Sequence, residues 1–170
     1  MHAGVGGPTF PAMRKFLGTA SVHAAAVPTT VFAAITDVDA LPLWNAAIER
    51  VVDRPAVLGT GTRWTVRMHP RHVPPWNSVS TVEVLDPELR HFGYRTQHAG
   101  GNPSFVRWHW SVVPSAGGAD VTVTWDCTLN TADRRWFGGP IRRRQLAREV
   151  PASLAALAAH VQSSTARPQP

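Results

Sequence analysis

The sequence has a single cysteine, Cys127, so neither an internal disulfide nor a four-cysteine metal site can form. Long hydrophobic runs are also missing, since the longest, such as residues 22–27, fall far short of the roughly 20 residues that span a membrane. The first residues are rich in Gly and Pro rather than basic and then apolar, so we expect no secretory signal. These absences make the cytoplasm the expected location.

Lysine is nearly missing as well, because every basic residue except Lys15 is an arginine. The formal net charge of +6 could indicate a nucleic acid or a membrane surface as partner. The arginines are mostly scattered, so we favour a compositional bias toward arginine and disfavour a nucleic-acid partner. One cluster near the C-terminus is the exception, and it includes the consecutive residues Arg142, Arg143 and Arg144.

A length of 170 residues and an apolar content of 44% suit one globular domain with its own core. We expect that domain over residues 17–161. The Gly- and Pro-rich stretch 1–16 predicts a flexible arm, and the polar stretch 162–170 predicts a disordered tail.

Periodicity predicts an α+β order of elements along this domain. A first strand over 17–27 is followed at Pro28 by a short helix, and Leu41 opens a second short helix. Turn signals then separate six strands of an antiparallel meander, which with the first strand make about seven: 48–53, 62–68, 78–85, 89–97, 105–113 and 121–129. After Asp133 the period becomes helical, and Pro151 should kink this last helix. Its apolar side is expected to consist of Ile141, Leu146, Val150, Leu154, Leu157 and Val161.

Alternation along the strands predicts which face of the sheet is buried. One set of alternate positions is apolar or aromatic on four strands at once, while the positions between them are charged or hydroxylic. The first set should face the C-terminal helix: Trp64, Val66, Met68, Phe92, Tyr94, Trp108, Trp110, Val112, Val121, Val123, Trp125 and Cys127. The second set, which includes Arg107, His109, Thr122 and Thr124, should face water.

Aromatic side chains are concentrated on the buried face, which holds four tryptophans and the only tyrosine of the chain. Two interpretations are open: the rings fill the core, or they line a pocket for a large planar or hydrophobic molecule. In the second interpretation the ligand-binding residues are Trp44, Trp64, Met68, Trp76, Phe92, Trp108, Trp110 and Trp125.

The order of strand, two short helices, meander and long terminal helix resembles the START-like or Bet v 1-like superfamily, which has the helix-grip fold. The similarity is greatest to its bacterial polyketide cyclase/dehydrase branch. Short motifs in matching order carry the resemblance: Pro28-Thr29-Thr30-Val31-Phe32, Leu41-Pro42-Leu43-Trp44-Asn45, Gly59-Thr60-Gly61-Thr62-Arg63-Trp64, Glu83-Val84-Leu85-Asp86-Pro87 and Val121-Thr122-Val123-Thr124. Ala119-Asp120 departs from the Gly-Thr that is common before the last strand, and this affects one turn only.

The resemblance implies a cavity between a curved sheet and the long helix, gated by loops, but a fold does not fix a function. Three functions stay open. The first is a cofactor-independent enzyme of the polyketide cyclase/aromatase type. The second is a non-catalytic carrier or sensor of a lipid, quinone or other hydrophobic small molecule. The third is a basic interaction module that acts through the Arg-rich helix.

Tyr94 is the candidate for chemistry on the inner face. A buried phenol must find a hydrogen-bond partner, and the neighbourhood offers Ser78, Ser80, water or the ligand itself. In a cyclase its hydroxyl would polarise a carbonyl or pass a proton. His98, by contrast, is expected to be solvated.

The segment 69–77 lies between two predicted strands and is stiffened by prolines. We interpret it as a lid at the cavity mouth, with Trp76 over the ligand and His69 as a second catalytic candidate that could swing inward. His69 and His72 have no nearby Asp, Glu or Cys to complete a ligand set, so no metal is expected. No cofactor is expected either, since no Gly-rich phosphate loop follows a strand.

The arginine cluster falls at the start of the last helix. Consecutive residues point around a helix, so at most some of Arg142, Arg143 and Arg144 can face the groove. The cluster is either a solvated face or the site of an anionic partner, such as an acyl carrier protein or a lipid head group.

Overall fold

The computed structural model describes residues 14–71, 73–130 and 139–165. The elements follow the α+β order expected from the sequence, and this prediction is confirmed. In chain order they are β1 (Arg14–Ala24), α1 (Pro28–Thr36), α2 (Leu41–Trp44), β2 (Ile48–Asp53), β3 (Arg63–Met68), β4 (Trp76–Asp86), β5 (His91–His98), β6 (Phe105–Ser115), β7 (Gly118–Leu129) and α3 (Gly139–Thr165).

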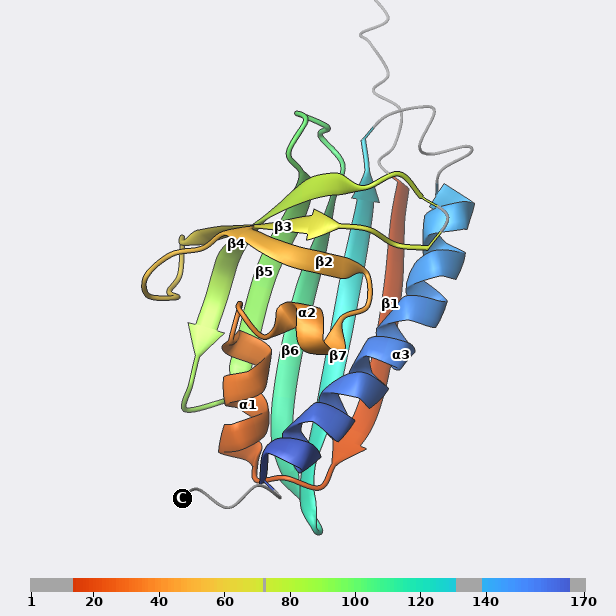
Figure 1. The fold of residues 1–170 in the computed structure, drawn as a ribbon. Coiled ribbons are helices and arrows are strands. Elements are labelled where there is room, and N and C mark those ends of the chain that lie inside the picture. Colours follow the sequence, from red (N-terminus) through yellow and green to blue (C-terminus); the bar gives the residue numbers. More distant parts are fainter. Residues whose placement is uncertain (1–13, 72, 131–138, 166–170) are drawn as a thin grey trace, which may run out of the picture.

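All seven strands of this order belong to one antiparallel sheet, arranged β1-β7-β6-β5-β4-β3-β2. The first strand of the chain thus pairs with the last one, while the strands between them form the expected meander. Figure 1 shows the sheet curving around α3, which crosses its concave face, with α1 and α2 at one end. The expected helix-grip arrangement is therefore present.

The first strand begins at Arg14 rather than at residue 17, where the sequence predicted its start after an arm over residues 1–16. The reason is its partner: β1 pairs with β7 along its whole length, starting from Arg14 opposite Leu129. Gly18 in this strand is required by packing, since a Cβ there would collide with the ring of Trp125. Residues 1–13 of the expected arm lie outside the described residues.

The long helix α3 continues through Pro151 and ends at Thr165, beyond the expected end of the domain at residue 161. Ser163 and Ser164 close its last turn, because both hydroxyls donate hydrogen bonds to the His160 carbonyl. Residues 162–165 therefore belong to the helix rather than to the expected tail.

Ile141 was expected on the apolar side of α3, and this prediction is wrong. Its side chain is 70% exposed, whereas the other five members of the predicted stripe are buried. Helical period explains the difference: Arg142, Leu146 and Val150 follow one another in steps of four, so Arg142 takes the inward position in the first turn.

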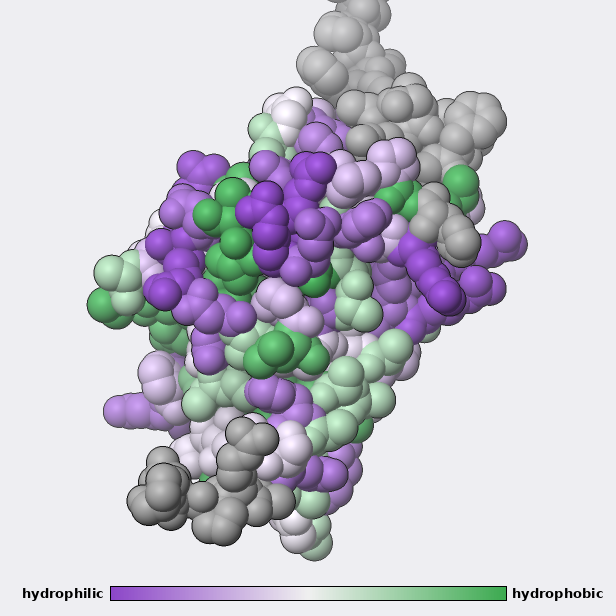
Figure 2. All heavy atoms as spheres, viewed as in Figure 1, coloured by the Kyte–Doolittle hydropathy of each residue, from purple (hydrophilic) through white to green (hydrophobic). Residues whose placement is uncertain are grey.

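Burial along the strands confirms the predicted alternation. Trp64, Trp110 and Trp125 are buried against the helix side, while His109 and Thr124 on the opposite face are exposed. Figure 2 shows apolar residues over α2 and the lower, alanine-rich half of α3, and hydrophilic residues crowded around β2. In the described part of the chain, no helix is long and apolar enough to cross a membrane.

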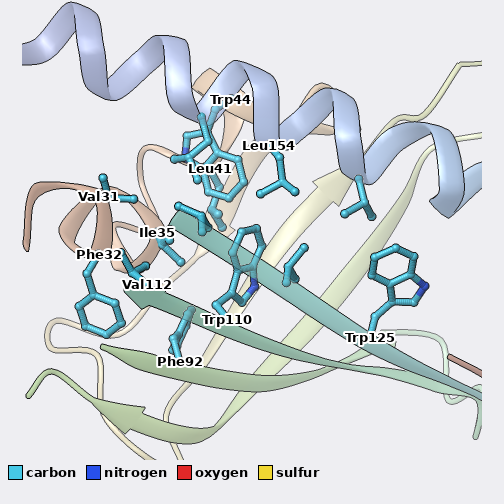
Figure 3. Close-up of a cluster of buried hydrophobic side chains, with 14 of the residues drawn as sticks. Val31, Phe32, Ile35, Leu41, Trp44, Phe92, Trp110, Val112, Trp125 and Leu154 are labelled. Atoms are coloured by element: carbon cyan, nitrogen blue, oxygen red, sulfur yellow. The ribbon is translucent and has the colours of Figure 1, made fainter. Parts of the chain in front are cut away.

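Buried apolar side chains fill the end of the sheet covered by α1, α2 and the second half of α3 (Figure 3). Trp44 of α2 meets Trp110 of β6 edge to face, with ring centroids 5.9 Å apart. Leu154 and Leu157 of α3 are 1% and 0% exposed above them. At this end the core fills the concave face, whereas core residues toward the other end, such as Trp64 and Val106, also border a cavity.

Candidate functional site

A cavity of about 570 Å³ lies on the concave face, at the end away from α1. The middle strands of the sheet form its floor, the β3–β4 connection borders it, and the first turns of α3 close one side. Its apolar and aromatic lining includes Leu41, Ile48, Trp64, Val66, Met68, Tyr94, Val106 and Trp108. Its polar lining includes Ser78, Ser80, Thr96, Gln97, His98, Asn102, Ser104, Cys127, Arg142 and Gln145.

A row of aromatic rings runs across the floor of the cavity. Tyr94 of β5 lies between Trp64, at a centroid distance of 5.0 Å, and Trp108, at 6.4 Å. Trp108 in turn contacts Trp125 at 6.0 Å. Tyr94 and Trp108 are directly opposite in the strand register, as are Trp108 and Trp125, so cross-strand pairing fixes the row.

The hollow exists because one strand supplies small side chains at this level. On β4 the inward positions are Ser78 and Ser80, whereas Val82 occupies the next inward position toward the core. Two serines fill less space than the rings on either side of them. Their hydroxyls are occupied, since Ser80 bonds Thr96 at 3.0 Å and Ser78 donates to the Gln97 carbonyl at 3.4 Å.

Tyr94 was expected to use Ser78, Ser80, water or a ligand as partner, and the two serines are bonded elsewhere. Burial raises the pKa of Tyr94 to about 12, and the Trp110 indole N–H, which lies near the phenol, opposes this rise less strongly. The Trp110 N–H forms no hydrogen bond of ordinary geometry with any described residue. At neutral pH Tyr94 therefore keeps its proton, and the residue lines the cavity.

His98 was expected to be solvated, but it lines the cavity. Its Nδ1 accepts a hydrogen bond from the backbone N–H of Gly100 at 2.8 Å. In the neutral imidazole the proton must then be on Nε2, so the ring offers a second donor. The sequence did contain the signal, because His98 is in phase with Phe92 and Tyr94 on β5.

Arg142 also lines the cavity, whereas Arg143 and Arg144 are exposed. Burial lowers the pKa of Arg142 below its usual range, and the charge of Glu149 opposes that shift. Burial likewise raises the pKa of the Cys127 thiol, which the Arg142 charge lowers to a lesser degree. A half-buried arginine and a protonated thiol thus occupy the α3 side of the cavity.

The segment 69–77 was predicted to be a lid, and Val73, Pro74, Pro75 and Trp76 do border the cavity. Trp76 is the first residue of β4 and pairs with Met68, so it belongs to the sheet rather than to a free loop. His69 is directed elsewhere: its side chain is exposed and its Nδ1 lies 3.3 Å from Glu49. His72 lies outside the described residues.

The structure separates the eight expected ligand-binding residues into two groups. Trp64, Met68, Trp76 and Trp108 are in the cavity wall. The other four are not: Trp44, Phe92 and Trp110 pack in the core, and Trp125 borders a smaller hollow of about 230 Å³ between β1 and α3. Because of their positions in the strands and in α2, these four side chains are covered by helices rather than by the large cavity.

No metal centre is formed by the described residues, which contain no group of three His, Cys, Asp or Glu side chains suited to hold an ion. In the same residues no Asp or Glu lines the cavity. Tyr94, His98, Cys127 and Arg142 all present protons rather than free bases. The arrangement can therefore hold a hydrophobic molecule and donate hydrogen bonds to its oxygen atoms.

The sequence of residues 15–162 matches the family described as polyketide cyclase / dehydrase and lipid transport. No curated protein sequence gives a significant match. Among solved structures, the Zhui aromatase/cyclase from Streptomyces sp. R1128 is 21% identical, covers 91% of this chain and 96% of its own, and has a TM-score of 0.66.

Two further structures have the same fold. The di-domain ARO/CYC StfQ from the steffimycin biosynthetic pathway is 12% identical, with a TM-score of 0.72 over 90% of this chain and 52% of that one. Norcoclaurine synthase from Thalictrum flavum, in complex with dopamine and hydroxybenzaldehyde, is 14% identical, with a TM-score of 0.64 over 89% of this chain and 88% of that one. At these identities the likeness establishes the Bet v 1-like helix-grip fold.

Proposed function

This chain belongs to the polyketide cyclase / dehydrase and lipid transport family, and from that premise we propose that its cavity holds a flat, carbonyl-bearing aromatic or polyketide-like molecule for ring closure. Family membership supports the coarser part, a hydrophobic small molecule as ligand. The Zhui and StfQ structures, described as aromatase/cyclase and ARO/CYC, support the finer part by analogy of fold.

One observation carries the proposal: a protonated phenol lies within a row of aromatic rings on the cavity floor. Trp64 and Trp108 flank Tyr94 on both sides, so a planar ligand on this row would stack on the rings. The Tyr94 hydroxyl would then lie beside the ligand's own atoms. A carbonyl oxygen is the acceptor that matches this donor.

Ring closure by aldol addition needs such a donor. A carbon next to one carbonyl loses a proton and bonds to the carbon of a second carbonyl, whose oxygen becomes an alkoxide and takes up a proton; dehydration then releases water. Donors aimed at that oxygen stabilise the developing charge, which is a large contribution in a water-poor cavity. Tyr94 is the candidate donor, and His98, through Nε2–H, is the second. Holding the two carbons close supplies the rest.

The test is to incubate a synthetic linear poly-β-ketone ester with the protein and to identify the cyclised products by chromatography and mass spectrometry. We expect one ring pattern to dominate, and Tyr94→Phe to lower its yield on the order of 10²-fold or more, the usual contribution of an acid–base group. Thr124→Val, on the outer face, is the control. Identical products with and without the protein would overturn the cyclase proposal.

A second function is favoured by a different observation, the lack of a carboxylate or other free base in the described cavity wall. A carrier needs only to bind, whereas a cyclase also needs an acceptor for the carbon-bound proton. In a carrier, a hydrophobic molecule retained by the purified protein would be released unchanged after incubation, as measured by mass spectrometry of the denatured extract.

An acyl carrier protein as partner is a separate proposal. It would use the exposed Arg143 and Arg144, because a carrier protein that presents acidic side chains would be attracted to them. Loss of the interaction in the double variant Arg143→Glu/Arg144→Glu, measured by titration against a phosphopantetheine-bearing carrier protein, is the expected result. Unchanged binding would contradict it.

A further inference from the structure

Arg142 differs from its two neighbours in its surroundings. Arg143 and Arg144 point away from the cavity and are exposed, while Arg142 lines it and keeps 27% of its side chain accessible. An arginine in the wall of a largely apolar cavity is unusual, since a charge taken out of water must be compensated. The groups that compensate Arg142 therefore indicate what the cavity is built to accept.

The compensation inside the protein is partial. Arg142 Nη1 donates to Gln145 Oε1 at 3.0 Å, and Gln145 Nε2 donates to Glu149 Oε1 at 2.8 Å. The direct distance from Arg142 Nη1 to Glu149 Oε2 is 3.8 Å, at the outer limit of an ion pair. Glu149 thus acts mainly through Gln145, which fixes the guanidinium without neutralising it at close range.

The remaining donors of Arg142 have no hydrogen-bond partner among the residues that the structure describes. A guanidinium carries five N–H groups and stays protonated in proteins, and Nε and Nη2 form no hydrogen bond with the described residues. The first turn of α3 also contains no acidic side chain, so the positive end of the helix dipole adds to the local potential. An anion in the cavity would meet a guanidinium fork with donors that no described residue occupies.

Building on the proposed function, we propose that the molecule in this cavity carries a carboxylate, which Arg142 binds while its aromatic part stacks on Trp64, Tyr94 and Trp108. A carboxylate matches the planar fork of a guanidinium with two parallel hydrogen bonds. Arg142 is accordingly the residue that sets the charge specificity of the site.

A purely structural role for Arg142 makes a different prediction. If it served only to link the first turns of α3 through Gln145 and Glu149, replacing it would lower the stability of the helix and affect all ligands equally. The charge of the ligand would not matter. A pair of ligands that differ only in that charge therefore separates the two roles.

The experiment uses anthraquinone-2-carboxylate and its neutral counterpart anthraquinone-2-carboxamide, titrated calorimetrically into the full chain. The wild-type protein should bind the carboxylate about tenfold more tightly or better, the usual value of hydrogen bonds to a charged group. Arg142→Met should abolish this preference and leave the affinity for the carboxamide within about threefold. Arg144→Met, with the same change at an exposed position, should keep it.

Equal binding of the two compounds by the wild-type protein, or a preference that survives Arg142→Met, would overturn the carboxylate proposal and leave cavity binding intact. If neither compound binds, the proposed function fails together with it. Arg142→Lys serves as a second variant if Arg142→Met does not fold. It keeps the positive charge but lacks the planar guanidinium that forms two parallel hydrogen bonds. It should retain the carboxylate preference in reduced form, and complete loss of discrimination or an unchanged preference would count against bidentate binding.

Discussion

At one end of the concave face Trp44, Trp110 and Leu154 fill the space under α3, whereas at the other end Trp64, Tyr94 and Trp108 border an open cavity. We call these the packed end and the open end. Both ends are lined by aromatic residues from the same strands; Trp108 and Trp110 are two positions apart on β6. The two ends differ in the elements that lie over the sheet. The packed end is covered by α1, α2 and the alanine-rich half of α3. The open end is bordered by the β3–β4 connection and the arginine-bearing turns of α3.

This comparison shows that an inward aromatic residue is not by itself a ligand residue. The strand supplies the direction of the side chain, and the elements above it decide whether the ring is covered by protein or by a cavity. On β4 the change from the packed end to the open end takes place over two positions, from Val82 to the smaller Ser80. Stability should therefore depend mainly on the packed end, and ligand affinity on the open end.

The largest effect is expected from Leu157→Ala at the packed end. Leu157 is fully buried, so the truncation should lower the free energy of unfolding by roughly 2–5 kcal/mol, measured by urea denaturation. The affinity of the folded fraction for anthraquinone-2-carboxamide should not change. Leu43→Ala, at a position that is 68% exposed, is the matched control and should cost little. A loss of affinity as large as the loss of stability would break the separation of the two ends.

Tyr94 gives the next effect, and because it is the only tyrosine its titration can be followed directly. The near-ultraviolet absorbance of the phenolate should rise with a midpoint at a pKa of about 12 instead of 10.0. The unfolded chain ionises first, so the contribution of Tyr94 to stability is complete below pH 10 and is lost as the pH rises toward 12. A midpoint near 10 in the folded protein would mean that the phenol is not desolvated.

A smaller effect is expected when only the hydroxyl of Tyr94 is removed. Tyr94→Phe should weaken binding of the carbonyl-bearing anthraquinone-2-carboxamide by roughly 0.5–1.5 kcal/mol, the net value of one hydrogen bond. The free energy of unfolding should change little, because the ring contacts stay. Thr124→Val controls for the loss of a hydroxyl on the outer face. Unchanged affinity in Tyr94→Phe would reduce Tyr94 to a packing residue.

The smallest effect belongs to His69, which lies outside the cavity beside Glu49. His69→Gln should change neither stability nor ligand affinity by more than about 0.5 kcal/mol, as for most exposed positions. Denaturation and calorimetry of the same preparation measure both. A tenfold loss of affinity would show that His69 reaches the ligand, as the sequence had suggested.

The faces of the sheet were predictable from the sequence, because a period of two residues places every second side chain on the same side. The same rule placed Tyr94 inward, and extended two steps further it would have placed His98 inward too. The division of the tryptophans between core and cavity was not predictable. It depends on where α1, α2 and α3 cover the sheet, which is a tertiary property absent from any single strand.

Arg142 illustrates the second limit of sequence analysis. Three consecutive arginines cannot be told apart by composition, and the inward one depends on the phase of α3. Counting back in steps of four from Val150 and Leu146 reaches Arg142, so the signal was present. The sequence analysis instead assigned the apolar residue Ile141 to the buried side of the helix, because the rest of that side is apolar. Polar residues on an otherwise apolar face are the positions where such an analysis should look for ligand contacts.

The most direct test of the division between the two ends is the nuclear magnetic resonance spectrum of the seven indole N–H groups, with assignments from single Trp→Phe variants. On titration with anthraquinone-2-carboxylate, the signals of Trp64 and Trp108 should shift strongly, while that of Trp44 at the packed end should stay in place. Shifts of Trp44 with unmoved signals of Trp64 and Trp108 would contradict the account, since the ligand would then bind where the structure has only core.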